Sequence, residues 1–283
     1  MARYSDYREQ IIAYYEKRES RLGYSVFLHG RKHFGYYPVG REHISMKFAQ
    51  RLMEDRMGIA LSLPQGSLVL DAGCGEGHTA MRLAERFGLR VEGIDLLNFN
   101  VARGRQLVQC RGSGSHVRLQ VGDYTSLPFG DETFDGIYTI EALVHAPEPQ
   151  SALKEFLRVL KPGGKLVLFE YSMPPQRDLG KAEREAFAAI NSGSAMYSFP
   201  EFENGRFGEI LTASGFDFSS VTDIRYRIAP MLRQMAVICW LPYQVAKLIS
   251  SESRYVNARA AVEYYRLREL MHYNIVIGLK PEA

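Results

Sequence analysis

The sequence predicts an α/β fold in which a mostly parallel sheet is covered by helices. An apolar run at residues 68–70 leads into a glycine-rich turn and then into helix-favouring residues 79–86, as in a strand, turn and helix unit. Further short apolar runs alternate with helical patterns as far as residue 169. The 283 residues are 46% hydrophobic, which is enough for the core of one large, elaborated domain.

Residues 5–20 predict an amphipathic helix, because aromatic and aliphatic side chains recur at three- and four-residue steps. The side chains on this face are Tyr7, Ile11, Tyr14 and Tyr15. Such a face needs a partner, which is either the rest of this domain or another subunit. We therefore expect a homo-oligomer that forms through this helix.

Residues 23–38 are rich in glycine and aromatic side chains and too irregular for a regular element. The side chains that could wall an apolar substrate, or set ring faces against a cation, are Tyr24, His33, Phe34, Tyr36 and Tyr37. Packing at the edge of the core is the alternative role for them. A helix over residues 41–60 follows, and we expect residues 1–60 to form a helical and aromatic substrate cap on a domain spanning residues 61–283.

The glycine-rich turn indicates a binding crevice, because unpaired N–H groups at a helix N-terminus favour a polar ligand. Gly73, Gly75 and Gly77 allow tight turning and close approach of a ligand. The turn fits the pyrophosphate-binding glycine pattern poorly, since His78 stands where the pattern requires glycine. A strand over residues 89–95 ends in Asp95, whose carboxylate can accept both hydroxyls of a ribose, so the pattern favours adenosine recognition.

Two further predicted strands bring polar residues to the same edge of the sheet. Residues 117–121, after a helix at 98–108, end at Asp123, which could accept from the exocyclic amine of adenine. Residues 134–140 deliver Glu141 and His145. In parallel α/β sheets ligands bind outside the carboxyl ends of the strands, so these side chains should meet one ligand.

The C-terminal half continues the same alternation of elements. We expect helices at residues 149–160, 181–190 and 201–214, and strands at residues 165–169, 219–224 and 273–278. The last two strands are separated by far more residues than a hairpin needs, and most of them follow a helical pattern. We therefore expect a helical insertion at residues 226–271 that acts as a lid or substrate wall.

Charge and composition narrow the range of partners. The net charge of +3 is spread without long single-sign blocks, so no nucleic-acid partner is expected. The three cysteines lack metal-ligand spacing, and we expect no metal and a reduced intracellular protein. The polar N-terminus is unlike a secretory signal, which predicts a cytoplasmic location. The apolar run at 228–249 is interrupted by charged residues and a proline, so we expect no membrane span, while membrane contact stays open.

The ordered motifs resemble those of the class I S-adenosylmethionine-dependent methyltransferases. They are the Leu-Val-Leu-Asp-Ala-Gly-Cys-Gly-Glu-Gly run at 68–77, Gly-Ile-Asp at 93–95, Gly-Asp at 122–123, Leu-Pro-Phe at 127–129 before Phe-Asp at 134–135, and Leu-Lys-Pro-Gly-Gly at 160–164. The resemblance implies a Rossmann-like seven-stranded sheet with an antiparallel last strand and helices on both faces. It also implies S-adenosyl-L-methionine as cofactor. The expected cofactor-binding residues are Asp71, Gly73, Cys74, Gly75, Asp95, Leu96, Asn100, Gly122, Asp123, Tyr124 and Glu141.

The segment at residues 138–147 is similar to the Glu-Ala-x-x-His-Ala-Pro run of the sterol C-24 methyltransferases. The chain is short for that group, and a sterol, a terpenoid or another prenylated natural product fits as the acceptor. Methylation of an alkene leaves a carbocation, which needs ring faces or a carboxylate and then a base. The expected catalytic residues are His145, Glu141, Tyr24 and Tyr36. O- or N-methylation is the alternative, and a dehydrogenase or a non-catalytic cofactor-binding protein also stays open.

Overall fold

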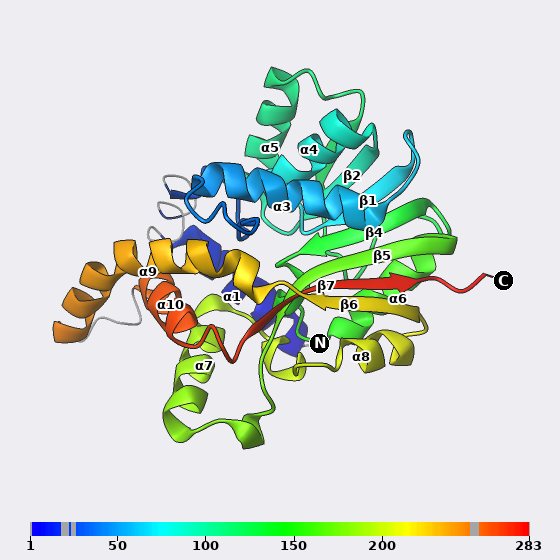
Figure 1. Ribbon diagram of the computed structural model, residues 1–283. Coiled ribbons are helices and arrows are strands. Elements are labelled where there is room, and N and C mark those ends of the chain that lie inside the picture. The colour runs from blue at the N-terminus through cyan, green and yellow to red at the C-terminus, as the bar shows by residue number, and fades with distance from the viewer. Residues whose placement is uncertain (1, 18–22, 24–26, 250–254, 283) are drawn as a thin grey trace.

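The computed structural model describes residues 2–17, 23, 27–249 and 255–282, and one seven-stranded sheet runs through it (Figure 1). The strands are β1 (Leu68–Ala72), β2 (Arg90–Asp95), β3 (Val117–Val121), β4 (Phe134–Ile140), β5 (Leu160–Ser172), β6 (Asp217–Asp223) and β7 (His272–Leu279). Their order is β3-β2-β1-β4-β5-β7-β6. Strands β1 to β5 pair in parallel, whereas β7 is antiparallel to both β5 and β6. This confirms the predicted fold class.

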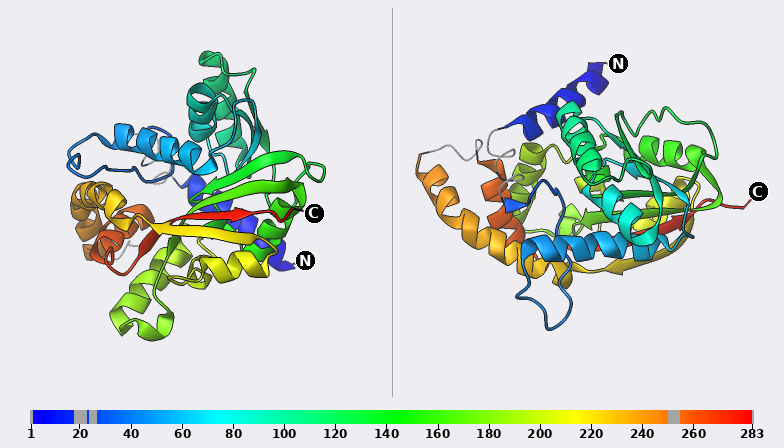
Figure 2. Two further views of the ribbon diagram at one scale, coloured as in Figure 1. Left: turned by 45° about the vertical axis from the view of Figure 1, so that its right-hand side comes forward. Right: turned by 90° about the horizontal axis from the view of Figure 1, so that it is seen from above.

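Helices cover both faces of the sheet. The described α-helices of the chain are α1 (Ala2–Glu16), α3 (Met46–Leu61), α4 (His78–Phe87), α5 (Asn98–Cys110), α6 (Pro149–Val159), α7 (Lys181–Ser194), α8 (Phe207–Ala213), α9 (Arg225–Leu248) and α10 (Val256–Arg266). Figures 1 and 2 show α3, α4 and α5 on one face and α6 and α8 on the other. The interior strands are buried on both sides, as parallel strands between helix layers require.

Several predicted bounds differ from the structure for local reasons. Helix α3 begins at Met46, not at residue 41, because the Ser45 hydroxyl caps it by accepting from the Phe48 N–H at 3.3 Å. Strand β5 begins at Leu160, which pairs with Phe134, whereas the prediction began it at residue 165. Helix α8 is shorter than residues 201–214, since a separate 3₁₀ turn, Phe199–Glu201, precedes it.

The apolar face of α1 packs inside the same chain. Tyr7, Ile11 and Tyr14 are buried with Ala195 and Val256, on the C-terminal side of α7 and at the start of α10. This face therefore has its partner within the domain. The homo-oligomer stays a prediction, but the apolar face of α1 no longer provides an argument for it. Helix α3 packs against α4, β4 and β5 in the layered core. The division at residue 60 also stays a prediction.

The predicted helical insertion consists of α9 and α10, which pack against each other beside the carboxyl end of β5 (Figure 2). Helix α9 has 24 residues and is continuous through Pro230 and Pro242. It also contacts β7, and Figure 1 shows its far end reaching beyond the sheet. The insertion thus forms one wall beside the edge where β1 to β5 end.

Candidate functional site

The glycine-rich turn after β1 adopts a conformation that favours glycine. Gly73, Gly75 and Gly77 have φ of 91°, 54° and 73°. A Cβ on Gly73 would lie 2.5 Å from the Cβ of Ala142, whereas the nearest atom to a Cβ on Gly75 is the Lys32 Nζ at 3.9 Å. The turn therefore lies directly against the segment that follows β4. Gly73 has less room for a side chain than Gly75.

Replacing Gly73 with alanine should weaken S-adenosylmethionine binding by roughly ten- to thirtyfold, because the clash and the positive φ must both be relieved by moving the turn. Isothermal titration calorimetry measures this change. Gly112→Ala is the matched control, since Gly112 also has a positive φ, of 67°, has room for a methyl group and does not line the cofactor cavity, so little change in affinity is expected. Equal affinities of the two variants would contradict this account of the turn.

Asp95 links this turn to the start of α5. Its Oδ2 accepts the Gly75 N–H at 2.8 Å, while Oδ1 accepts the Leu97 N–H at 2.9 Å and the Asn100 amide at 3.1 Å. The Asn100 Oδ1 in turn accepts from the Lys32 Nζ at 2.7 Å. Burial lowers the pKa of Lys32, which comes from the irregular segment before α3. A remote lysine is thus linked through Asn100 to the carboxylate predicted to bind ribose.

Asp123 at the end of β3 is held by its own turn and by α1. Its Oδ1 accepts the Thr125 N–H and hydroxyl, and its Oδ2 accepts the Tyr7 hydroxyl at 2.9 Å and pairs with Arg8 at 2.6 Å. Burial raises the pKa of Asp123, but hydrogen bonds from Thr125 and Tyr7 outweigh this and leave it below its ordinary value. Helix α1 therefore lies across the edge where adenine is expected.

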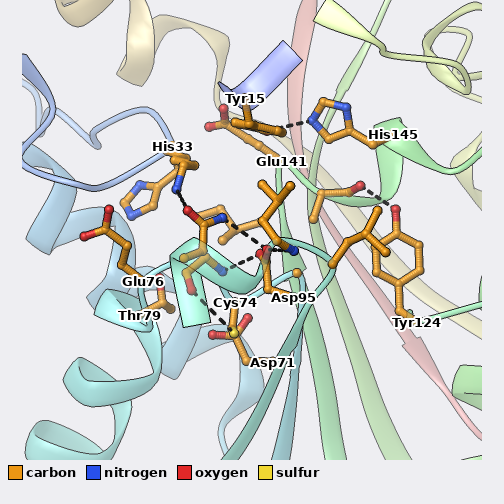
Figure 3. A pocket seen from close by; sticks show the side chains of 18 of the residues that line it. Tyr15, His33, Asp71, Cys74, Glu76, Thr79, Asp95, Tyr124, Glu141 and His145 are labelled. Carbon is orange, nitrogen blue, oxygen red and sulfur yellow. Dashed lines mark hydrogen bonds between the residues drawn. The ribbon is translucent and has the colours of Figure 1, made fainter. Parts of the chain in front are cut away.

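One cavity with about 910 Å³ of empty space unites these elements (Figure 3). All of the expected cofactor-binding residues line it, namely Asp71, Gly73, Cys74, Gly75, Asp95, Leu96, Asn100, Gly122, Asp123, Tyr124 and Glu141. They come from the carboxyl ends of β1 to β4 and from the start of α5. Below, this cavity is called the cofactor cavity.

The residues of the cofactor cavity fit a polar cofactor. Asp71 is fully buried near the Tyr138 hydroxyl, but among the residues that the structure describes neither of its carboxylate oxygens makes a hydrogen bond of good geometry. Burial raises the pKa of Asp71 to about 7. A buried carboxylate facing a cavity without a donor is costly, so a ligand amino or hydroxyl group would satisfy it. Glu76 Oε2 and the ring of buried His78 also face this cavity.

Burial lowers the pKa of His78 to about 3, so the folded protein keeps this ring neutral at pH values where the unfolded chain protonates it. The contribution of His78 to the unfolding free energy should therefore fall below about pH 6.5, by about 1.4 kcal/mol per pH unit. Urea unfolding of the parent and His78→Gln between neutral and acidic pH measures the difference. His116→Gln, at an exposed histidine, is the control. Parallel pH profiles for the parent and His78→Gln would contradict the expectation.

His145 lies at the end of the cofactor cavity, in the 3₁₀ turn Leu143–His145 after β4. Its Nδ1 donates to the Ala195 carbonyl at 2.9 Å, because a carbonyl can only accept. Its Nε2 therefore accepts from the Tyr15 hydroxyl of α1 at 3.0 Å, as Figure 3 shows. Burial lowers the pKa of His145, so the ring is neutral and its Nε2 is a proton acceptor.

Glu141 is enclosed by donors. Its Oε1 accepts the Phe34 N–H at 2.7 Å and the Tyr273 hydroxyl at 2.8 Å, and its Oε2 accepts the Tyr171 hydroxyl. Burial raises its pKa, whereas the donors from Tyr171 and Phe34 lower it. Because three hydrogen bonds already use this carboxylate, the geometry favours His145 over Glu141 as a proton acceptor. Glu141 fixes Phe34 and two tyrosines instead.

A second, more apolar cavity with about 1060 Å³ of empty space adjoins the first. Below, it is called the apolar cavity. Its walls come mainly from α1, the segment before α3, β5, α9 and α10. Five residues line both cavities: Tyr15, Lys32, His33, Glu141 and His145. These five residues, His145 and Tyr15 among them, therefore lie where the two cavities meet.

The expected substrate-wall residues divide into three groups. His33 and Phe34 line the apolar cavity, and Phe34 packs edge-on against Tyr171 with ring centroids 5.9 Å apart. Tyr24 lies outside the described residues. Tyr36 and Tyr37 line neither cavity. The Tyr36 ring packs on the Arg56 guanidinium at 4.5 Å and its hydroxyl accepts from Arg56, whereas Tyr37 is buried in the hydrophobic core. Tyr36 is therefore not placed to contact a substrate in either cavity.

Apart from Phe34, the sequence reasoning missed the aromatic rings that line the apolar cavity. These are Tyr14, Tyr15, Phe27, Tyr171 and Tyr264. Tyr171 lies two residues after the end of the predicted strand at residues 165–169. Because alternate residues of an extended strand point to the same face, this spacing could have indicated that Tyr171 lies on the same side as residue 169. Tyr264 lies in the insertion, where a helical pattern alone does not indicate which side faces a ligand.

Among the described residues, no group of three or more His, Cys, Asp and Glu side chains is placed to hold a metal ion. Within the same ranges, no helix has the length and apolar character needed to cross a membrane.

The chain is similar to several proteins of known name. A family model described as a methyltransferase domain matches residues 70–168. The S-adenosyl-L-methionine-dependent Diels-Alderase iccD of Talaromyces variabilis is 32% identical over 96% of this chain and 94% of its own length. The sterol 24-C-methyltransferase of Eremothecium gossypii is 33% identical over 66% of this chain and 48% of its own. The geranyl diphosphate C-methyltransferase of Streptomyces coelicolor A3(2) superposes with a TM-score of 0.74 at 19% identity, over 97% of each chain.

Proposed function

Because the chain belongs to the S-adenosylmethionine-dependent methyltransferases, near their sterol and terpenoid members, we propose that it C-methylates an alkene of a hydrophobic small molecule. A prenyl, terpenoid or sterol-like acceptor fits an aromatic cavity beside a cofactor cavity. The observation that carries the proposal is the neutral His145, paired with Tyr15, at the boundary of the two cavities.

S-adenosylmethionine, when bound, supplies an activated methyl group. The cofactor cavity offers Asp95 near Gly75, and the buried Asp71, as sites for its polar groups. The chain then has to align an alkene in the apolar cavity, exclude water and remove a proton. The buried tyrosine and phenylalanine walls support the first two requirements.

The proton is assigned to His145. Methylation of an alkene leaves a positive charge on carbon, and loss of a neighbouring proton restores a double bond. Tyr15 can pass that proton to the His145 Nε2, which already accepts its hydroxyl hydrogen bond. The Nδ1 bond to the Ala195 carbonyl keeps the ring in the tautomer that this requires and favours the resulting imidazolium.

The developing cation has suitable surroundings on the apolar side. Phe34, Tyr171 and Tyr264 present aromatic rings to the apolar cavity, and Tyr171 and Tyr264 stack with centroids 6.1 Å apart. The buried carboxyl group of Glu141 also lines this cavity and accepts the Tyr171 hydroxyl hydrogen bond. These groups take the place of Tyr36 in the proposed mechanism, and the role expected for Tyr24 stays a prediction.

Cyclisation is a second candidate, favoured by one observation. A relative named as a Diels-Alderase matches almost the whole chain, whereas the sterol 24-C-methyltransferase covers about two thirds of it. A [4+2] cyclisation needs an apolar cavity that folds a polyene but no proton acceptor. O- or N-methylation is the further alternative, in which His145 would take the proton of the acceptor.

A product screen separates these functions. The protein and S-adenosylmethionine are incubated with a panel of sterols, prenyl diphosphates, prenylated alkaloids and linear polyenes, and the products are analysed by mass spectrometry. The proposal predicts a product heavier by one CH2 group, with a new C–CH3 signal and a shifted double bond in its NMR spectrum. A product isomeric with its substrate would instead support cyclisation, and a new O–CH3 or N–CH3 signal the further alternative.

A further inference from the structure

The outer side of α9 exposes a continuous apolar surface. Val237, Leu241 and Leu248 are 72%, 64% and 85% exposed, and Val245 lies between the last two. Their spacing of four, four and three residues keeps them on one side of the helix. Single exposed apolar residues are ordinary, but an aligned group of this size on one helix indicates an interaction surface. These four residues and Trp240 are called the α9 patch.

A line of basic and aromatic residues runs beside this stripe. Arg233, Trp240 and Lys247 follow one another at seven-residue intervals, so they lie along one edge of the helix. All three are exposed, Trp240 by 56%. The helix Arg225–Leu248 contains four basic residues and no Asp or Glu. The α9 patch is therefore apolar, and Arg233 and Lys247 place positive charge along one of its edges.

We infer that the α9 patch docks on an anionic lipid surface. A helix that lies in a membrane interface buries an apolar stripe, places tryptophan at the headgroup level and pairs lysine and arginine with anionic lipid. All three features occur together here. A second copy of the chain is a poorer occupant, since pairing two such faces would bring Arg233 and Lys247 opposite like charges.

The α9 patch lies next to the apolar cavity. Ile238 is 40% exposed next to the patch and also lines the apolar cavity, together with Cys239 on the following position. The patch and the cavity are thus neighbouring sides of one helix. If the proposed function holds, a hydrophobic acceptor dissolved in a bilayer could enter the cavity beside Ile238. The docking itself does not depend on the reaction.

Trp240 makes the inference directly measurable, because it is the single tryptophan of the chain. Its fluorescence is recorded while vesicles of phosphatidylcholine, with or without phosphatidylglycerol, are added to the full chain. We expect a blue shift with the phosphatidylglycerol vesicles that is weakened by added salt. An emission maximum that does not move would overturn the inference. So would a blue shift that follows protein concentration without vesicles, since this would mark a subunit interface.

Matched variants assign the binding to the patch. Leu241→Ser with Leu248→Ser keeps the tryptophan and should weaken vesicle binding at least tenfold, because two exposed leucines no longer enter the interface. Val39→Ser with Ile59→Ser, at exposed positions outside α9, is the control and should bind vesicles like the parent. Thermal unfolding checks that both proteins fold. Equal binding by the two double variants would overturn the inference, whatever reaction the enzyme catalyses.

A second pair tests the charge. Arg233→Gln with Lys247→Gln should weaken binding to phosphatidylglycerol vesicles by about tenfold or more, since each cation near an anionic surface contributes independently. Arg177→Gln with Lys181→Gln, at exposed positions near the start of α7, is the matched control. Loss of binding in both pairs alike would mean that net charge, and not α9, attracts the protein, which contradicts the inference.

Discussion

Replacing His145 with alanine should lower kcat by about 10²- to 10⁴-fold, the usual contribution of a positioned general base. The neutral ring, its Nδ1 bond to Ala195 and its Nε2 bond to Tyr15 are the basis of this expectation. The affinity for S-adenosylmethionine should change little, because His145 is not among the residues expected to bind it and lies at the end of the cofactor cavity. Steady-state kinetics and calorimetry measure the two quantities separately.

Two further measurements distinguish a base from a structural residue. Burial lowers the pKa of His145, so the acidic limb of the pH–kcat profile should lie below pH 6.5, the ordinary histidine value, and should vanish in His145→Ala. Tyr15→Phe removes only the hydroxyl that donates to the ring, and we expect about a tenfold loss of kcat with unchanged thermal stability. If His145→Ala kept the parent kcat, the residue would have no part in the reaction.

Replacing Asp95 with alanine should weaken S-adenosylmethionine binding by about 10²- to 10³-fold. The variant loses the acceptor for the Gly75 and Leu97 N–H groups and for the Asn100 amide, so the glycine turn and the start of α5 lose their common anchor. A hydrogen bond to a charged group contributes about 1.5–3 kcal/mol. Equilibrium binding of S-adenosylmethionine measures the loss.

Asp135→Ala is the control for this substitution. Asp135 also accepts a backbone N–H, that of Leu68 at 2.7 Å, and pairs with Lys161, but it lies at the opposite end of the sheet from the cofactor cavity. Its variant should bind S-adenosylmethionine like the parent after correction for any unfolded fraction. Similar losses in both variants would indicate a general effect on stability and would remove Asp95 from the cofactor site.

The core of the fold was predictable because its signals are local. The apolar run at β1, the glycine turn and the acidic ends of β2 and β3 each depend on a few neighbouring residues. Parallel pairing then places all strand ends at one edge, which is why the expected cofactor-binding residues meet in one cavity. Shifts at α3, β5 and α8 come from caps and turns that the pattern of apolar residues does not specify.

The substrate side was less predictable, because it depends on contacts between distant segments. The pair of Tyr15 with His145 joins residues 130 positions apart, and Lys32 reaches Asn100 across 68. The density of aromatic residues at 23–38 suggested a substrate wall, which stays a prediction, but it did not indicate which rings line the apolar cavity. Tyr36 turns to Arg56, whereas Tyr171 and Tyr264 come from β5 and the insertion. Side-chain direction in an irregular segment is fixed by tertiary packing, which a single sequence does not reveal.

The position of an isotopic methyl label tests the central claim most directly. The protein is incubated with S-adenosylmethionine carrying a trideuterated methyl group and with the acceptor found in the product screen, and NMR locates the label. The account predicts a CD3 group bonded to carbon in a product whose double bond has moved. A label on oxygen or nitrogen, or an unlabelled product isomeric with the acceptor, would contradict C-methylation of an alkene.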